Sequence, residues 1–162
     1  LGICYGMQMA IIEFARNKLN LKKATSSEFD KKGLAIIGLM NEWNKDGKKI
    51  KGTDKNLGGT MRLGSYDAKL LKNSMIQKIY GKNLIKERHR HRYEVNIAFK
   101  EKFEKNGMNF SGLSPDGNLP EIIELKNHPW FIGVQFHPEF KSRPLAPHPL
   151  FSSFIKASKN HK

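Results

Sequence analysis

The chain has 162 residues, of which 38% are hydrophobic, and this composition suits one domain with one core. Its single cysteine excludes an internal disulfide framework. No apolar run is long enough to cross a bilayer, and no stretch has the basic and apolar regions of a signal peptide. We therefore expect one domain of a reducing, cytoplasmic protein that has no membrane partner.

Positive charge dominates the composition, with 29 Lys and Arg against 15 Asp and Glu and a formal net charge of +14. Such an excess can indicate nucleic-acid binding. The lysines are scattered along the chain, however, without a basic helix or an aromatic stacking platform. We interpret them as solvated surface residues, and the pattern argues against specific nucleic-acid binding.

Hydrophobic periodicity and turn residues predict the elements in chain order. The expected elements are a strand ending at residue 3, a helix over 7–19, a polar loop over 24–32, an apolar segment over 34–40, an exposed loop over 44–56, a turn and strand pair over 58–71, a helix over 74–80, an extended segment over 86–95, a helix over 99–106, strands over 108–113 and 121–125, a buried strand over 130–136, and a helix over 148–159. This order predicts an α/β fold.

The first residues contain Gly-x-Cys-x-Gly, the pattern of a nucleophile elbow centred on Cys4. In an elbow a strand ends, the chain turns sharply at the nucleophile, and a helix begins, so glycines are expected wherever a Cβ would collide across the turn. The helix N-terminus would also favour a thiolate. A lone cysteine is more often a small buried side chain. The other end of the chain decides between these alternatives.

His137-Pro138-Glu139 follows the apolar stretch 130–136. A catalytic cysteine needs a base, and the base needs a group that fixes its tautomer. His137 and Glu139 are two residues apart at the end of a buried strand, so both side chains can project to one side. Together with the elbow, they predict a Cys4, His137, Glu139 catalytic set.

The segment 86–95 alternates basic residues along one extended strand. His89 and His91 would share a face, but the neighbouring arginines disfavour a metal site, and an arginine clamp for an anion or carboxylate is the better hypothesis. Gly58 and Gly59 suit a tight turn before a strand. A phosphate cradle is the weaker alternative, since no Gly-Lys-Ser/Thr follows.

Taken together, these motifs resemble the class I glutamine amidotransferase domain of the CTP synthase family. The most specific similarity lies in Arg-His-Arg-His-Arg-Tyr-Glu-Val and Gly-Gly-Thr-Met-Arg-Leu-Gly. The matching stretches are 2–8, 12–17, 58–64, 87–96, 121–124 and 134–140. The resemblance implies a three-layer, flavodoxin-like α/β fold with a mostly parallel central sheet and appended antiparallel strands.

The resemblance also implies roles for individual residues. Cys4 would attack glutamine and form a thioester, His137 would transfer protons, and Glu139 would orient His137. The backbone N–H of Tyr5 would donate to the oxyanion. The glutamine-binding residues would be Tyr5, Gly6, Met7, Gln8, Glu28, Arg92 and Tyr93. This segment would hold no cofactor or metal.

The partner implied by the family is a synthetase domain that uses ATP and Mg²⁺ to aminate UTP to CTP, in a protein that assembles as a homo-tetramer. The family also has elements before the cysteine, including a glycine-rich loop that supplies a second oxyanion donor. We therefore expect residues 1–162 to be an amino-terminally incomplete domain that is inactive alone. The alternative functions are a non-catalytic interaction fragment or pseudoenzyme, and a basic nucleic-acid-binding module.

Overall fold

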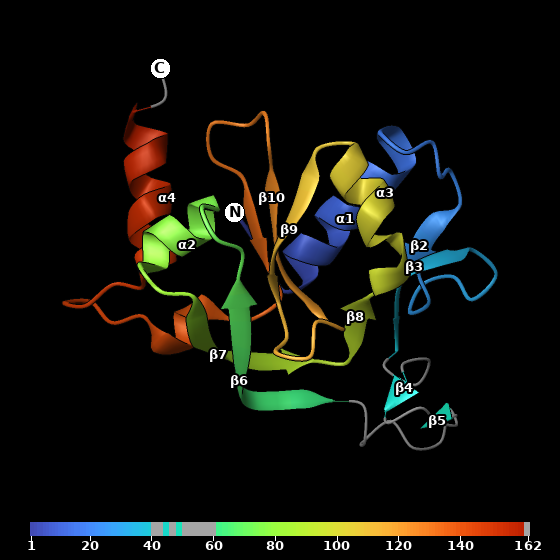
Figure 1. The fold of residues 1–162 in the computed structure, drawn as a ribbon, viewed down its shortest axis with the longest axis horizontal. Helices are drawn as coiled ribbons and strands as arrows, with labels where there is room; N and C mark the ends of the chain where they lie inside the picture. Colours follow the sequence, from blue (N-terminus) through green and yellow to red (C-terminus); the bar gives the residue numbers. More distant parts are fainter. Residues whose placement is uncertain (40–43, 46–47, 50–60, 161–162) are drawn as a thin grey trace.

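The computed structural model describes residues 1–39, 44–45, 48–49 and 61–160. Its helices and strands follow one another along the chain in the order drawn in Figure 1. They are β1 (Gly2–Ile3), α1 (Tyr5–Asn17), β2 (Ala24–Ser26), β3 (Leu34–Leu39), β4 (Asn44–Lys45), β5 (Lys48–Lys49), β6 (Arg62–Leu70), α2 (Met75–Tyr80), β7 (Leu84–His91), β8 (Tyr93–Val95), the 3₁₀ turn η3 (Ile97–Phe99), α3 (Lys100–Lys105), β9 (Met108–Leu113), β10 (Pro120–Leu125), β11 (Ile132–Val134), the 3₁₀ turn η4 (Pro138–Lys141) and α4 (Pro149–Asn160).

The described strands form a six-stranded sheet in the order β1-β11-β10-β9-β6-β7, a three-stranded sheet β2-β3-β8, and the pair β4-β5. In the large sheet β1 runs parallel to β11, and the remaining neighbours are antiparallel. In the small sheet β2 and β3 are parallel and β8 is antiparallel. The chain therefore has mixed sheets with helices around them.

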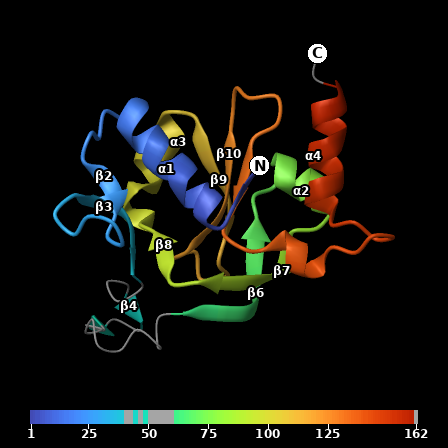
Figure 2. The ribbon, with the colours of Figure 1, turned by 180° about the vertical axis from the view of Figure 1, so that it is seen from behind.

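The sheet has a hydrophobic core on each face, which gives the predicted three layers. Ile122 and Ile123 are consecutive in β10, so their side chains point to opposite faces. Ile123 packs in the core beside α1 and α3, and Ile122 packs in the core beside α2 and α4. Figures 1 and 2 show these two helix pairs on opposite sides of β9 and β10.

The balance of strand directions corrects one expectation. The α/β class is confirmed, but the prediction of a mostly parallel central sheet is wrong for the strands that the structure describes. The physical reason for β9, β10 and β11 is their short connections, residues 114–119 and 126–131. Such short links place neighbouring strands antiparallel, whereas parallel strands need longer crossovers.

Most predicted elements are confirmed within a few residues, and the differences are local. The polar segment 24–32 begins with strand β2, and the buried strand expected over 130–136 is regular only in β11. In α4 the apolar stripe is buried at Leu150, whereas Ile155 is exposed. The glycines at 58–59, and all of the loop over 44–56 except β4 and β5, lie outside the described residues.

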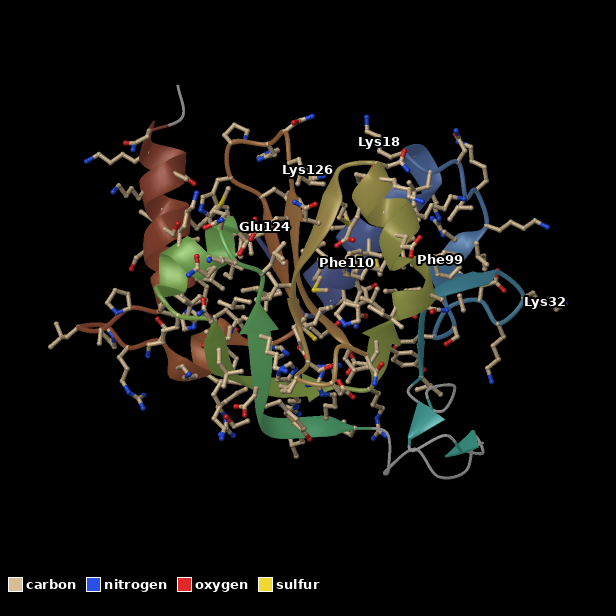
Figure 3. The ribbon with its side chains drawn as sticks, viewed as in Figure 1. Lys18, Lys32, Phe99, Phe110, Glu124 and Lys126 are labelled. Carbon is tan, nitrogen blue, oxygen red and sulfur yellow. The ribbon has the colours of Figure 1, made fainter. Side chains whose placement is uncertain are left out.

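Buried and exposed charges have different places in the fold. The Glu124 carboxylate accepts hydrogen bonds from the backbone N–H groups of Met75 and Ile76 at the start of α2, and Figure 3 shows its label beside that helix. Lys18 and Lys32, also labelled there, are exposed, as expected of solvated lysines. Among the described residues, no helix has the length and hydropathy needed to span a membrane.

Candidate active site

Cys4 is the turning point between β1 and α1. Its backbone has φ 49° and ψ −104°, which is the strained conformation expected of an elbow. The Cys4 N–H donates to the carbonyl of Val134 at 2.7 Å and thereby extends the β1–β11 pairing. This pairing holds the thiol at the end of β11.

The two glycines of the motif differ in their surroundings. A Cβ on Gly2 would lie 3.0 Å from backbone atoms of Gly6 and Met7, so the turn closes only with glycine there. A Cβ on Gly6 would meet nothing within 4 Å among the described residues. The expectation of a collision across the turn is therefore confirmed for Gly2 and wrong for Gly6.

His137 and Glu139 lie just beyond the end of β11. The His137 N–H donates to the carbonyl of Arg88 in β7, and the imidazole stacks on Phe140. His137 Nδ1 is 2.6 Å from Glu139 Oε1, and because a carboxylate accepts, Nδ1 carries the proton. His137 Nε2 then keeps a lone pair. It is buried and has no hydrogen-bond partner among the described residues, so it is available as a base.

The electrostatic surroundings of the thiol are mixed. Burial raises the pKa of Cys4 above its usual value, and the negative charges of Glu94 and Glu139 raise it further. Hydrogen bonds from the Tyr5 backbone and the Gln135 side chain act in the opposite direction. The expectation that the helix N-terminus favours a thiolate is therefore outweighed by burial, and the thiol needs a base to become a nucleophile.

A buried amide pair connects the thiol to β8. Gln135 Nε2 is 3.6 Å from Cys4 Sγ, and Gln135 Oε1 accepts from Gln8 Nε2 at 3.1 Å. Gln8 Nε2 also donates to the carbonyl of Tyr93 at 2.9 Å. Sequence reasoning did not single out Gln135. The available signal was an amide inside an otherwise apolar buried run, because such a group requires a buried partner.

Two other segments lie close to the elbow. The Tyr5 ring contacts the ring of Phe29 edge to face at 6.1 Å, which places the turn after β2 beside the start of α1. Glu28 is in that turn and its side chain is exposed. Arg92 is half-buried between β7 and β8, next to Tyr93, whose carbonyl contacts Gln8. The segments that carry Glu28 and Tyr93 therefore contact the start of α1 from the small sheet, at Phe29 and at the Tyr93 carbonyl.

The predicted binding residues at the start of α1 present different groups. Met7 is fully buried in the core, so only its backbone faces the elbow. Gly6 is exposed, and Gln8 is 4% exposed with its amide nitrogen engaged as described above. The Tyr5 residue is 53% exposed, so a bound molecule can reach its side chain, whereas at Met7 and Gln8 the backbone is more available than the side chain.

The inward face of β7 and β8 carries a buried ion cluster, and the anion clamp expected of an arginine in this segment stays a prediction for Arg92. Arg62 of β6 lies 3.1 Å from Glu94 Oε1 and 2.7 Å from Glu121 Oε1, and both carboxylates have side chains at 0% exposure. Burial raises the pKa of both, in the case of Glu94 to about 8. Arg62 is thus a structural cation that two buried carboxylates share.

His89 and His91 share a face, as predicted, and they contact each other. His89 Nδ1 is 2.9 Å from His91 Nε2, and His91 Nδ1 is 3.1 Å from the Tyr93 carbonyl. Burial, followed by the Arg62 charge, lowers the pKa of His89 to about 2 and of His91 to about 3. Both rings are therefore neutral members of the buried cluster. Among the described residues no group of three or more His, Cys, Asp or Glu is arranged to hold a metal ion.

Comparison with known proteins gives a consistent picture. The family model "Glutamine amidotransferase class-I" matches residues 1–157. The chain is 88% identical over its whole length to a CTP synthase of Pelagibacter ubique (strain HTCC1062), of which it covers 30%. It is 58% identical over 158 residues, 97% of its length, to a CTP synthase of Hyphomonas neptunium (strain ATCC 15444), of which it covers 29%.

A solved structure is similar as well. The glutaminase domain of Trypanosoma brucei CTPS, with bound acivicin, superposes with a TM-score of 0.84 at 36% identity and covers 99% of this chain and 60% of that one. The chain spans about 30% of the length of the curated relatives it matches. Because the family model accounts for 157 of the 162 residues, the chain belongs to the glutamine amidotransferase class-I family.

Proposed function

We propose that this chain is the glutaminase part of a CTP synthase, hydrolysing glutamine to glutamate and ammonia. The observation that carries the proposal is the elbow at Cys4 beside the end of β11, where His137 Nδ1 is held by Glu139 and Nε2 is left with a free lone pair. This arrangement supplies a nucleophile, a base and an orienting carboxylate.

The proposed reaction proceeds in two halves. His137 Nε2 takes the proton of Cys4, the sulfur attacks the side-chain amide carbon of glutamine, and the negative charge on oxygen is stabilised by the Tyr5 N–H. His137 then gives its proton to the amide nitrogen, which leaves as ammonia, and a thioester remains. Water, deprotonated by His137, attacks the thioester and releases glutamate and the thiol.

Glu139 has the role of an orienting group in this scheme. Its contact with His137 Nδ1 fixes the tautomer that presents a lone pair at Nε2, and it stabilises the imidazolium that forms in each half-reaction. Substrate recognition is assigned to the surrounding segments. We propose that the backbone from Tyr5 to Gln8 and the Tyr93 segment line the site, while Glu28 contacts the ammonium and Arg92 the carboxylate of glutamine.

In the full-length protein the ammonia would pass to a synthetase domain, which we propose uses ATP and Mg²⁺ to aminate UTP to CTP. The near-complete match to CTP synthases over a segment that covers 30% of their length supports this division of labour. We further propose that the whole protein is cytoplasmic and assembles as a homo-tetramer.

The test uses the full-length protein with Cys4→Ala. Glutamine-dependent CTP formation should be abolished, while synthesis from supplied ammonia should continue, because only the thioester route needs the sulfur. The measurement is CTP formation with each nitrogen source, together with glutamate release. A variant that kept the wild-type glutamine-dependent rate would contradict the assignment. If the wild type itself released no glutamate, the chain would be a non-catalytic relative.

A further inference from the structure

Gln135 has a place in the site that the two proton-transfer steps do not use. It follows β11 directly and is 0% exposed between the apolar residues Val134 and Phe136. A buried amide is costly unless its polar atoms are paired. Both of its contacts lie within the site, since its nitrogen faces Cys4 Sγ and its oxygen faces Gln8.

The direction of these hydrogen bonds is fixed by a group that cannot reverse. The Tyr93 backbone carbonyl can only accept, so the Gln8 side chain must turn its nitrogen toward it. The same nitrogen then donates to Gln135 Oε1, and this contact leaves Gln135 Nε2 as the atom that faces the sulfur. An amide flip at either glutamine would bring two acceptors or two donors together.

We propose that Gln135 is a positioning residue for the nucleophile: its amide, held by Gln8 and the Tyr93 carbonyl, donates to Cys4 Sγ and stabilises the sulfur as it becomes a thiolate. Its effect on turnover rests on the proposed glutaminase function, whereas the contact with the sulfur does not. The donor is aligned before substrate arrives, because both glutamine side chains are nearly or fully buried. When the thioester forms, the sulfur loses its charge and the contact weakens.

The first experiment measures the thiol directly, in the full-length protein and without glutamine. The rate of Cys4 alkylation by iodoacetamide is followed against pH, with the Cys4 peptide quantified by mass spectrometry. Gln135→Met keeps the side-chain length and removes the donor. The midpoint of its alkylation profile should therefore lie about one pH unit higher than that of the wild type. Gln135→Glu places a negative charge beside the sulfur, so the midpoint of its alkylation profile should lie at a still higher pH.

Gln77→Met is the matched control, because Gln77 lies in α2 and its amide contacts only Asn83 among the described residues. Its alkylation profile should superpose on that of the wild type. In glutamine-dependent turnover, Gln135→Met should lower kcat about tenfold at pH 7 with ammonia-dependent synthesis unchanged. A general loss of packing would not rank the Met and Glu variants by charge.

A second variant keeps the proposal testable if substitutions at Gln135 prevent folding. Gln8→Met removes the group that orients the Gln135 amide, and it should also raise the midpoint pH of Cys4 alkylation. If both variants fold, their combined effect should be smaller than the sum of the two.

If the folded Gln135→Met variant, or Gln8→Met where the former does not fold, had the alkylation profile of the wild type, the proposal would be overturned. If alkylation shifts as expected but the wild type releases no glutamate, the proposed function fails while the contact between Gln135 and the sulfur stands.

Discussion

The elbow and the buried ion cluster around Arg62 lie close together but are built by opposite means. At the elbow, Cys4 is set by a strained backbone and by close approach at Gly2, so local geometry fixes the reactive atom. In the cluster, Arg62 is set by partners from β8 and β10, so long-range pairing fixes the charge. One region is therefore specified by consecutive residues and the other by residues that meet only in the folded chain.

This difference has an energetic consequence. The elbow can lose a reactive atom without losing its fold, because the backbone and not the sulfur makes the turn. The cluster cannot lose Arg62 without leaving the buried carboxyl groups of Glu94 and Glu121 without the cation that they contact. Substitutions at the catalytic residues should accordingly lower turnover with little effect on folding stability, whereas substitutions in the ion cluster should lower the free energy of unfolding.

The largest effect is expected at the base. His137→Ala should lower glutamine-dependent turnover on the order of 10³-fold or more, because both half-reactions need a proton acceptor. Glu139→Gln should be milder, since it retains a group near Nδ1 and removes only the charge. Steady-state glutamate release measures both, with ammonia-dependent synthesis as the control. Equal losses at the two positions in single-turnover thioester formation would contradict the separate roles.

The ion cluster should give a loss of stability. Arg62→Met leaves Glu94 and Glu121 without their cation and should reduce the free energy of unfolding by about 3–5 kcal/mol. Chemical denaturation of the full-length protein measures it. Arg90→Met is the matched control, because Arg90 lies on the same hairpin and is exposed, so its effect should stay within about 1 kcal/mol. Similar losses for the two arginines would show that the cluster is not a stabilising element.

The same contrast explains what the sequence could predict. The elbow and the His-Pro-Glu turn were predictable because their residues are close in sequence and local conformation defines their roles. The alternation of β7 was predictable too, and it placed His89 and His91 on one face. The sequence could not show that this face is the inner one, because the buried partners of the two histidines, Glu121 and Glu94, come from other strands.

Gln135 was missed for a related reason. An amide in a buried run signals that a partner exists, but only the β1–β11 pairing reveals that the partner is Cys4. The expected excess of parallel strands failed because it was inferred from the family and not from connection lengths. The connections over 114–119 and 126–131 are too short for a parallel crossover, so β9, β10 and β11 are antiparallel neighbours.

A recognition effect of intermediate size is expected at Arg92. Arg92→Ala should raise the glutamine concentration needed for half-maximal activity about 30-fold, which corresponds to a lost charge-assisted contact of about 2 kcal/mol. Ammonia-dependent turnover should be nearly unchanged. Glutamine saturation curves measure the effect, and Arg88→Ala, an exposed arginine on β7, is the comparison. An unchanged curve for Arg92→Ala would remove this residue from the glutamine site.

The smallest effect concerns pH. The folded pKa of His91, about 3, lies below its unfolded value near 6.5, so the stability that this neutral ring contributes is fully present above pH 6.5 and is lost as pH falls toward 3. His91→Gln can still donate to the Tyr93 carbonyl and accept from His89, but it does not titrate. Between pH 6.5 and 5.5 the stability of the wild type relative to this variant should therefore decrease by up to about 1.4 kcal/mol.

The stability contribution of Glu94 should depend on pH in the direction opposite to that of His91. Its folded pKa, about 8, lies above the ordinary value, so its contribution is present below about pH 4.5 and is lost as pH rises through 8. Glu94→Gln should therefore gain stability relative to the wild type between pH 5 and 8, in the direction opposite to His91→Gln. Denaturation curves at several pH values measure both. If the free energy of unfolding had the same pH dependence in the wild type and the two variants, His91 would not be buried as a neutral ring and Glu94 would not be buried as a protonated acid. The cluster would then be a hydrated pocket.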